Sequence, residues 1–370
     1  MCTNMPVQSP VKTQTETENV APTAGSSSNS IVDYIPLKLV LWLASPYLAG
    51  ESYKSAIDKA HELYRTNRFT GTIDILGEDC TSDADCDQFV DAYKQTIDAV
   101  AARLLPVSRP NEQLSISFKP SMFSPMVPTE QRPDRVQVLA KAYDRMVEVV
   151  AYAKQRGVNM TLEAEDHRWA DFHIDSYLAL VKAGYSNLGT VIQSRLFRTK
   201  EDLKRFDESH RVRMVIGIYN EPSSIAQTDK AVMKKLLVDY AAELAARGTY
   251  LEIATHDADC LRDFIERVAI PQRLDSSRWE NQMLLGVPRI ELQQSLVSGK
   301  YFADLANGGS AVASSTKAIE YLSEMARSGV PVRMYLPYGK DAVAAPYCKR
   351  RLKANPNMML FGIKNALHIK

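Results

Sequence analysis

Short apolar runs alternate with longer amphipathic segments along most of this 370-residue chain. Several runs are nearly continuous in Val, Ile, Leu and Met, which is typical of strands in a parallel sheet buried on both faces. They predict strands at residues 70–77, 114–119, 159–165, 188–193, 211–219, 249–255, 282–287 and 331–337. Apolar residues at helical spacing predict helices between them, at residues 86–104, 130–156, 172–184, 229–247, 258–268 and 314–328.

The order of these elements predicts the fold class. Eight strands, most of them followed by a helical segment, are typical of a (β/α)8 barrel. The alternative is an open, doubly wound sheet, but no G-x-G-x-x-G motif follows the first strand. We therefore predict an α/β protein with a distorted TIM-like barrel.

Three parts of the chain are distinguished by composition. Residues 1–30 are rich in Ser, Thr, Pro, Gln and Asn, which predicts a disordered polar tail. Residues 31–68 contain a helical pattern and predict an N-terminal helical extension that caps the bottom of the barrel. Residues 69–370 form the predicted barrel domain, in which a basic helix at residues 341–355 lies over the barrel mouth.

The charge balance and the cysteines limit the class of protein. Lys and Arg number 45 against 44 Asp and Glu, so no broad basic field predicts a nucleic-acid partner. The most apolar run, at residues 35–48, is shorter than the roughly 20 residues of a spanning helix, so we predict no transmembrane segment. The five cysteines are scattered, which predicts reduced thiols in a cytoplasmic protein. Whether the basic helix makes a peripheral contact with the inner membrane is left open.

Polar residues stand where the predicted strands end, and in a barrel this is the catalytic face. A buried strand that ends in a charged group is costly unless that group faces a wet cleft or a ligand. The residues concerned are Glu78, Lys119, Glu163, Glu165, Asp166, Gln193, Tyr219, Glu221, Thr255, His256, Asp257 and Tyr335. No metal-ligand spacing and no G-x-S-x-G motif occurs, so we predict no metal site and expect a cofactor to carry the reaction.

The last helix carries a second candidate constellation. Tyr347, Arg350 and Arg351 are spaced at i, i+3 and i+4, so they share one helix face. Two guanidinium groups beside a phenol suit a bidentate grip on a carboxylate with an aromatic wall next to it. The alternative is a solvated basic face.

The same polar positions lie in motifs that resemble the FAD-dependent, monofunctional bacterial proline dehydrogenase family. The motifs follow in order along residues 70–355, and one such match alone would be weak. They are ILGE (75–78), SISFK (115–119), EAE (163–165), VIQ (191–193), RMVIGIYNEP (213–222), ATHD (254–257), ENQMLLG (280–286), RMYLPYG (333–339) and YCKRRL (347–352).

The resemblance implies non-covalently bound FAD and assigns roles to residues. The catalytic residues would be Lys119, Glu163 and Arg213. The substrate would be bound by Lys119, Leu284, Tyr335, Tyr347, Arg350 and Arg351. The cofactor would be bound by Gln193, Arg213, Gly217, Tyr219, Thr255 and His256. As alternatives, Gln193 and Thr255 are satisfied polar groups of the barrel interior, and Lys119 forms a purely structural salt bridge with Glu163.

Several positions depart from the family pattern near the implied site. Glu163 stands in place of an aspartate, and Ile216 stands in place of a lysine beside the flavin site. Ser194-Arg195 replaces Ala-Tyr, Asn281 replaces an aromatic residue, and Leu285 replaces an aromatic residue or histidine. These changes affect the surroundings of the substrate more than they affect the fold.

By this resemblance we expect oxidation of L-proline to 1-pyrroline-5-carboxylate. A hydride would pass to flavin N5 and the electrons to a quinone or another acceptor. The departures motivate an alternative, a specialised relative that oxidises a proline-derived ring in the biosynthesis of a carbapenem-type antibiotic. A non-catalytic ligand-binding barrel is a third hypothesis, which the retained arginines and tyrosines argue against.

Overall fold

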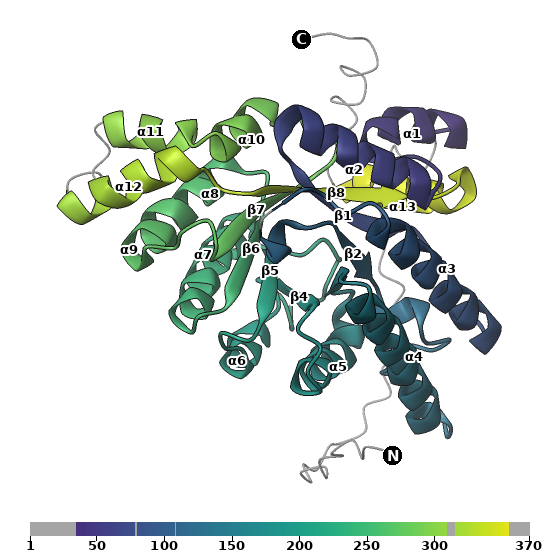
Figure 1. Ribbon diagram of the computed structural model, residues 1–370. Helices are drawn as coiled ribbons and strands as arrows, with labels where there is room; N and C mark the ends of the chain where they lie inside the picture. Colours follow the sequence, from purple (N-terminus) through teal and green to yellow (C-terminus); the bar gives the residue numbers. More distant parts are fainter. Residues whose placement is uncertain (1–34, 78–79, 108, 309–314, 355–370) are drawn as a thin grey trace, which may run out of the picture.

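Eight parallel strands close into a barrel in the order β1 to β8. The computed structural model describes residues 35–77, 80–107, 109–308 and 315–354 (Figure 1). The strands are β1 (Thr70–Ile75), β2 (Ser115–Phe118), β3 (Asn159–Leu162), β4 (Leu188–Gln193), β5 (Arg211–Val215), β6 (Tyr250–Ala254), β7 (Trp279–Leu284) and β8 (Val332–Tyr338). The predicted (β/α)8 barrel is thereby confirmed.

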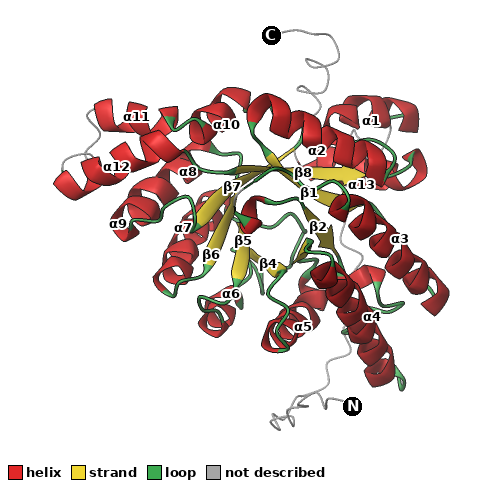
Figure 2. Ribbon diagram, in the orientation of Figure 1, coloured by secondary structure: helices red, strands yellow, loops and turns green. Residues whose placement is uncertain are grey.

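Helices surround the strands on the outside (Figure 2). They are α1 (Leu37–Ala44), α2 (Tyr53–Asn67), α3 (Asp83–Ala101), α4 (Arg135–Gln155), α5 (Ala170–Lys182), α6 (Thr199–Asp202), α7 (Lys230–Ala246), α8 (Ala258–Phe264), α9 (Ile270–Gln272), α10 (Ile290–Val297), α11 (Lys300–Asn307), α12 (Thr316–Ser328) and α13 (Asp341–Ala354). A π-helical segment, Ile265–Ala269, joins α8 to α9. The sequence pattern missed α10 and α11, two short helices separated by Gly299.

Helix α2 lies along β1 and β8, where the helix after the last strand of a regular barrel would lie. Its buried face consists of Ala56, Ile57 and Ala60. A Cβ atom at Gly71 would lie 2.8 Å from the side chain of Leu336 and 3.4 Å from that of Ala60, so this glycine allows the close packing. The N-terminal extension therefore covers the side of the barrel and does not cap its bottom as we expected.

The last helix, α13, packs against α1 instead of β8. The two helices share a small apolar cluster that is separate from the main core and consists of Val40, Ala44, Tyr47, Cys348 and Leu352. Figure 1 shows α1 and α13 side by side, next to the end of β8. Because α2 already covers β8, the closing helix is free to take this different place.

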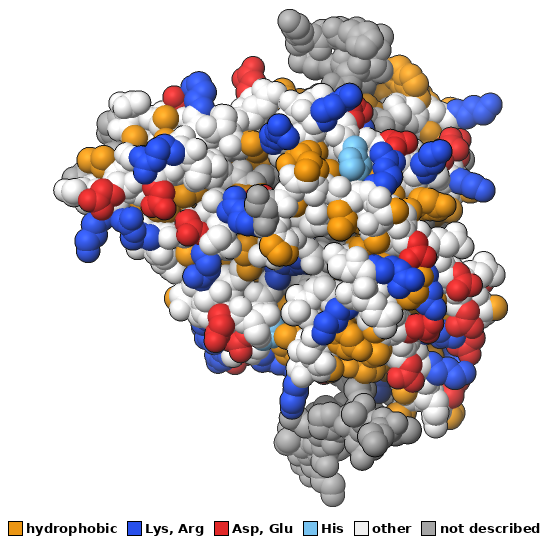
Figure 3. All heavy atoms as spheres, viewed as in Figure 1, with side chains coloured by type: hydrophobic (Ala, Val, Ile, Leu, Met, Phe, Trp, Pro, Cys, Tyr) orange, Lys and Arg blue, Asp and Glu red, His pale blue; other side chains and the backbone are white. Residues whose placement is uncertain are grey.

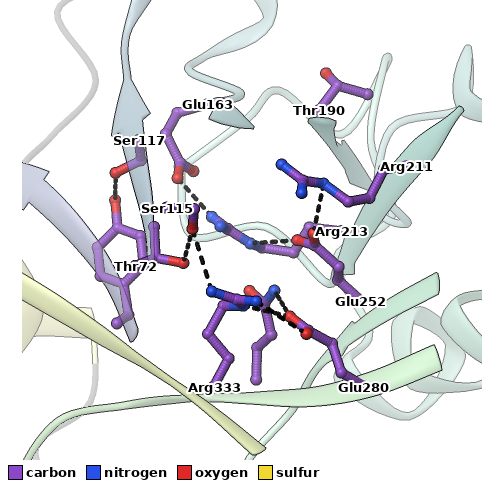
Figure 4. Close-up of polar contacts among 12 residues, drawn as sticks. Thr72, Ser115, Ser117, Glu163, Thr190, Arg211, Arg213, Glu252, Glu280 and Arg333 are labelled. Atoms are coloured by element: carbon purple, nitrogen blue, oxygen red, sulfur yellow. Dashed lines mark hydrogen bonds and ion pairs between the residues drawn. The ribbon is translucent and has the colours of Figure 1, made fainter. Parts of the chain in front are cut away.

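The barrel interior is filled with charged and polar side chains. In β5, Val212 and Met214 face outward into the helical layer and are fully buried, while Arg211 and Arg213 point inward (Figure 4). Near the start of the last two strands, Arg333 pairs with Glu280 at 2.6 Å. Arg333 also donates to the backbone oxygens of Gly71, Asn111 and Gln113.

On the face of the molecule seen in Figure 3, Lys, Arg, Asp and Glu side chains are interspersed. Among the helices that the structure describes, none is both long and apolar enough to cross a bilayer.

We predict that Arg333→Met destabilises the protein by about 3–5 kcal/mol, because it leaves the carboxylate of Glu280 buried without a cation. Urea denaturation of the variant and of the parent protein measures the difference. The control is Lys300→Ala, which removes an exposed pair with Asp304 and is expected to cost about 0.5 kcal/mol or less. Equal losses for the two variants would contradict the structural role of the interior pair.

Candidate functional site

Three residues predicted for the site meet through direct contacts inside the barrel. Arg213 on β5 pairs with Glu163, which follows β3, at 2.5 Å between Nη1 and Oε1. The guanidinium carbon of Arg213 lies 5.4 Å from the ring centre of Tyr335 on β8, within the range of a cation–π contact. The phenol hydroxyl of Tyr335 and the hydroxyl of Ser117 on β2 are hydrogen-bonded to each other at 3.2 Å.

Arg213 is a permanently charged group held between two carboxylates. Glu163 contacts one side of its guanidinium, and Glu252 on β6 lies 3.4 Å from Nε. Burial opposes the charged form, but these two carboxylates outweigh it and raise the pKa of Arg213 above its usual value. Glu252 also pairs with Arg211 at 3.1 Å, so the ion pairs form a continuous network across the barrel (Figure 4).

Lys119 is held in the same region by Asp74, a residue that the sequence motifs did not single out. Its ammonium lies 2.6 Å from Oδ1 of Asp74 on β1, and Ser117 donates to the same oxygen at 2.9 Å. The salt bridge between Lys119 and Glu163, which we considered as an alternative, is not formed, because Glu163 pairs with Arg213 instead. The signal for Asp74 was its place in the run TGTIDI, since an acidic residue inside a strand buried on both faces requires a partner.

Burial and charge set the protonation of two of these groups. Burial alone would lower the pKa of Lys119, but the charge of Asp74 and its hydrogen bond to the ammonium outweigh that effect and raise the pKa. Burial, followed by the charges of Asp74 and Glu163, raises the pKa of Tyr335 well above its usual value. Near neutral pH the site therefore presents an ammonium and a neutral phenol.

A second group of predicted residues lies where β4 and β5 end. Nε2 of Gln193 donates to the backbone oxygen of Glu165 at 2.8 Å, while the buried Oε1 accepts no hydrogen bond from any residue that the structure describes. Gly217 has a φ of +94°, and a Cβ there would lie 2.5 Å from Oε1 of Gln193. A glycine is thus required at this position, both for its conformation and for the close approach to the amide. The backbone oxygen of Tyr219 accepts a hydrogen bond from Arg195.

The predicted residues at the ends of β6 and β7 are held by backbone contacts. Nε2 of His256 accepts a hydrogen bond of 2.8 Å from the backbone N–H of Leu284. Oγ1 of Thr255 accepts one of 3.1 Å from the N–H of Asp257, the residue that caps α8. Leu284 is the register partner of Tyr335, so the predicted apolar wall lies next to the phenol.

On the closing helix, only part of the predicted constellation is described. Tyr347 is partly buried and packs against the apolar cluster shared by α1 and α13. The side chains of Arg350 and Arg351 lie outside the described residues, so their grip on a carboxylate stays a prediction. Within the described part of the chain, no group of three or more His, Cys, Asp or Glu side chains is arranged to hold a metal ion.

Comparisons with known proteins point to one family. The family model described as proline dehydrogenase matches residues 56–361. The proline dehydrogenase of Deinococcus radiodurans is 30% identical over 331 residues, which cover 88% of this chain and 91% of that protein. Proline dehydrogenase 1 of Bacillus subtilis strain 168 is 27% identical over 325 residues, which cover 88% of this chain and 90% of that protein.

The solved structures that match are of longer proteins. Proline utilization A of Bdellovibrio bacteriovorus, inactivated by N-propargylglycine, has a TM-score of 0.67 at 19% identity. A mutant of proline utilization A from Bradyrhizobium japonicum has a TM-score of 0.65 at 20% identity. The matches cover 84% and 86% of this chain but only 32% and 31% of those chains, so this chain spans about a third of their length. At these identities the likeness shows the fold alone.

We predict that Asp74→Asn lowers the pKa of Lys119, because burial then acts on the ammonium without its nearest opposing charge. The pH dependence of acylation at Lys119, followed by mass spectrometry, measures this pKa. Ser117→Ala is the control, since it removes a hydrogen bond to Asp74 and leaves the charge in place. A pH profile identical to that of the parent protein would show that Asp74 does not hold the proton on Lys119.

Proposed function

The chain belongs to the proline dehydrogenase family, and we propose that it is an oxidoreductase that converts L-proline to 1-pyrroline-5-carboxylate. The observation that carries this proposal is the buried guanidinium of Arg213, which lies beside Tyr335 and Glu163 inside the barrel. A permanent cation held in a low-dielectric site stabilises negative charge that develops next to it, without reorganisation.

We propose FAD as the cofactor, because the residues present fit a flavin. Oε1 of Gln193 and Nη2 of Arg213 are buried and make no hydrogen bond to any described residue. Buried polar atoms in proteins are nearly always hydrogen-bonded, so a ligand with both donors and acceptors on its edge is expected here. Gly217 provides the close backbone approach that such a ligand needs. The residues that would hold FAD are Gln193, Arg213, Gly217, Tyr219, Thr255 and His256.

FAD, when bound, supplies an acceptor for the hydride at N5. The residues of this chain would bind and orient the substrate. Arg350 and Arg351 would grip its carboxylate, while Leu284, Tyr335 and Tyr347 would form the apolar walls around its ring. Such a grip fixes the reacting carbon in one place, which is a large part of the catalytic effect in a hydride transfer.

Lys119 keeps its proton because Asp74 lies beside it, and Arg213 is charged at all accessible pH values. Neither group would therefore act as the base that takes a proton from the substrate amine before a hydride leaves the carbon next to it. The electrons would then pass to a quinone or another acceptor.

A second candidate is the oxidation of a proline-derived ring in a biosynthetic pathway, as for a carbapenem-type antibiotic. One observation favours it: Glu163 pairs with Arg213, and it is one methylene longer than the aspartate of the family pattern. Asn281 is fully buried, but it lies between Glu280 and Gln282 on β7 and faces the helical layer, where it donates to the backbone oxygen of Ile253 at 2.9 Å. A comparison of kcat/KM for proline and for ring-substituted prolines separates the two functions.

We predict that the purified protein is yellow and that L-proline bleaches its flavin absorbance under anaerobic conditions. Stopped-flow absorbance near 450 nm follows the reduction directly and needs no added electron acceptor. D-Proline is the control ligand. When its carboxylate binds in the same place, its opposite configuration turns the wrong hydrogen of the reacting carbon toward the flavin. A protein that takes up FAD but is not reduced by proline or by substituted prolines would refute the proposed activity.

We also predict that Arg350→Ala raises the KM for proline about tenfold or more, since a charge-assisted bond to the carboxylate contributes roughly 1.5–3 kcal/mol. The FAD content, read from the ratio of flavin to protein absorbance, is expected to be unchanged. Arg327→Ala on the exposed face of α12 is the matched control and should leave KM as it is. An unchanged KM in Arg350→Ala would remove the carboxylate role of this residue.

A further inference from the structure

Arg195 joins the two loops that follow β4 and β5. Its backbone N–H donates to the oxygen of Ile216 at 3.3 Å, and its backbone oxygen accepts from Gln227 at 2.7 Å. Leu196 and Ala226, next to these residues, form an isolated antiparallel bridge. Position 195 is therefore fixed in space against position 216.

The side chain of Arg195 lies along the proposed cofactor residues. A Cβ atom at Gly217 would lie 2.8 Å from Cδ of Arg195 as well as 2.5 Å from Oε1 of Gln193. The guanidinium donates to the backbone oxygen of Tyr219 and, at 3.5 Å, to that of Gln227. The aliphatic part of the Arg195 side chain thus runs past Gly217. It lies beside the side-chain amide of Gln193, whose Oε1 accepts no hydrogen bond from the described residues.

Arg195 is unusual in its charge environment. The nearby arginines Arg198, Arg211 and Arg213 each pair with a carboxylate. Within the described ranges Arg195 makes no ion pair, and its Nε is buried without a hydrogen-bond partner. A partly buried cation without an anion is unfavourable unless an anionic group reaches it from outside the chain.

The proposed cofactor carries such a group. Its flavin and adenine rings are neutral when oxidised, so the negative charge of FAD resides in its diphosphate. We propose that Arg195 binds the diphosphate of FAD and supplies the positive charge that Ile216 no longer provides; this inference rests on the proposed function. The family pattern has a lysine at position 216 and a tyrosine at position 195, and the two positions are hydrogen-bonded neighbours. In this chain the positive charge therefore stands on the loop after β4, whereas the family pattern places it on the loop after β5.

The competing explanation is that Arg195 only ties the loops together through the two carbonyl groups. Three variants separate the roles. Arg195→Gln removes the positive charge. Arg195→Lys keeps the charge but loses the planar guanidinium that reaches both carbonyl groups. The double variant Arg195→Gln/Ile216→Lys restores the charge on the neighbouring loop. The Kd for FAD is measured for each by equilibrium dialysis of the full chain, at low and at high salt.

We expect Arg195→Gln to raise the Kd for FAD about 10- to 100-fold, the range of one charge-assisted bond. Arg195→Lys and the double variant are expected to stay within about threefold of the parent protein. The affinity of the parent protein should fall with salt more steeply than that of Arg195→Gln, because the contact is ionic.

Two results would overturn the inference. The first is an unchanged Kd in Arg195→Gln. The second is an increase of the Kd for FAD in Arg195→Lys and in the double variant that is as large as the increase in Arg195→Gln. This result would assign Arg195 to loop structure. If Arg195→Gln does not fold, as judged by its thermal melting, Arg195→Lys and the salt dependence of the parent protein still decide between the roles. A parent protein that does not bind FAD would contradict the proposed function itself, which is a different outcome from either of these.

Discussion

The barrel interior holds charged groups away from bulk water, and each of them needs a partner of opposite charge. In this medium an unpaired charge costs several kcal/mol, so the cations and the carboxylates are arranged as pairs: Arg333 with Glu280, Arg211 with Glu252, Arg213 with Glu163, and Lys119 with Asp74. The first pair lies near the start of the strands and serves the fold. In the last two pairs, the same requirement fixes side chains that we propose to face a ligand.

The charges of the site are set by more than one ion pair. Glu163 reaches Arg213, and Lys119 relies on Asp74. The residue that sets the protonation of Lys119 is therefore on β1 and not on the strand that carries the acidic motif. A change at one member of such a network alters the charge balance of its neighbours, because their pairing is shared.

The fold could be predicted from the sequence because strands that are buried on both faces consist of nearly continuous apolar runs. The seventh strand was predicted to begin at Gln282, but β7 begins at Trp279, because the polar residues Glu280 and Asn281 interrupt the apolar run. Glu280 faces the charged interior, where it pairs with Arg333. The site was predicted through motifs at the strand ends, which is why Asp74, inside a strand, was missed. Contacts between loops, such as those of Arg195 with Tyr219 and Gln227, depend on distances that no periodicity encodes.

The small apolar cluster between α1 and α13 has a consequence for how the molecule opens. It is separate from the core that holds the barrel together, so the two helices form a unit of their own with few buried side chains. Such units come apart at a lower free energy than the whole protein unfolds. The contact between α1 and α13 is therefore expected to open more readily than the barrel, whose core it does not share.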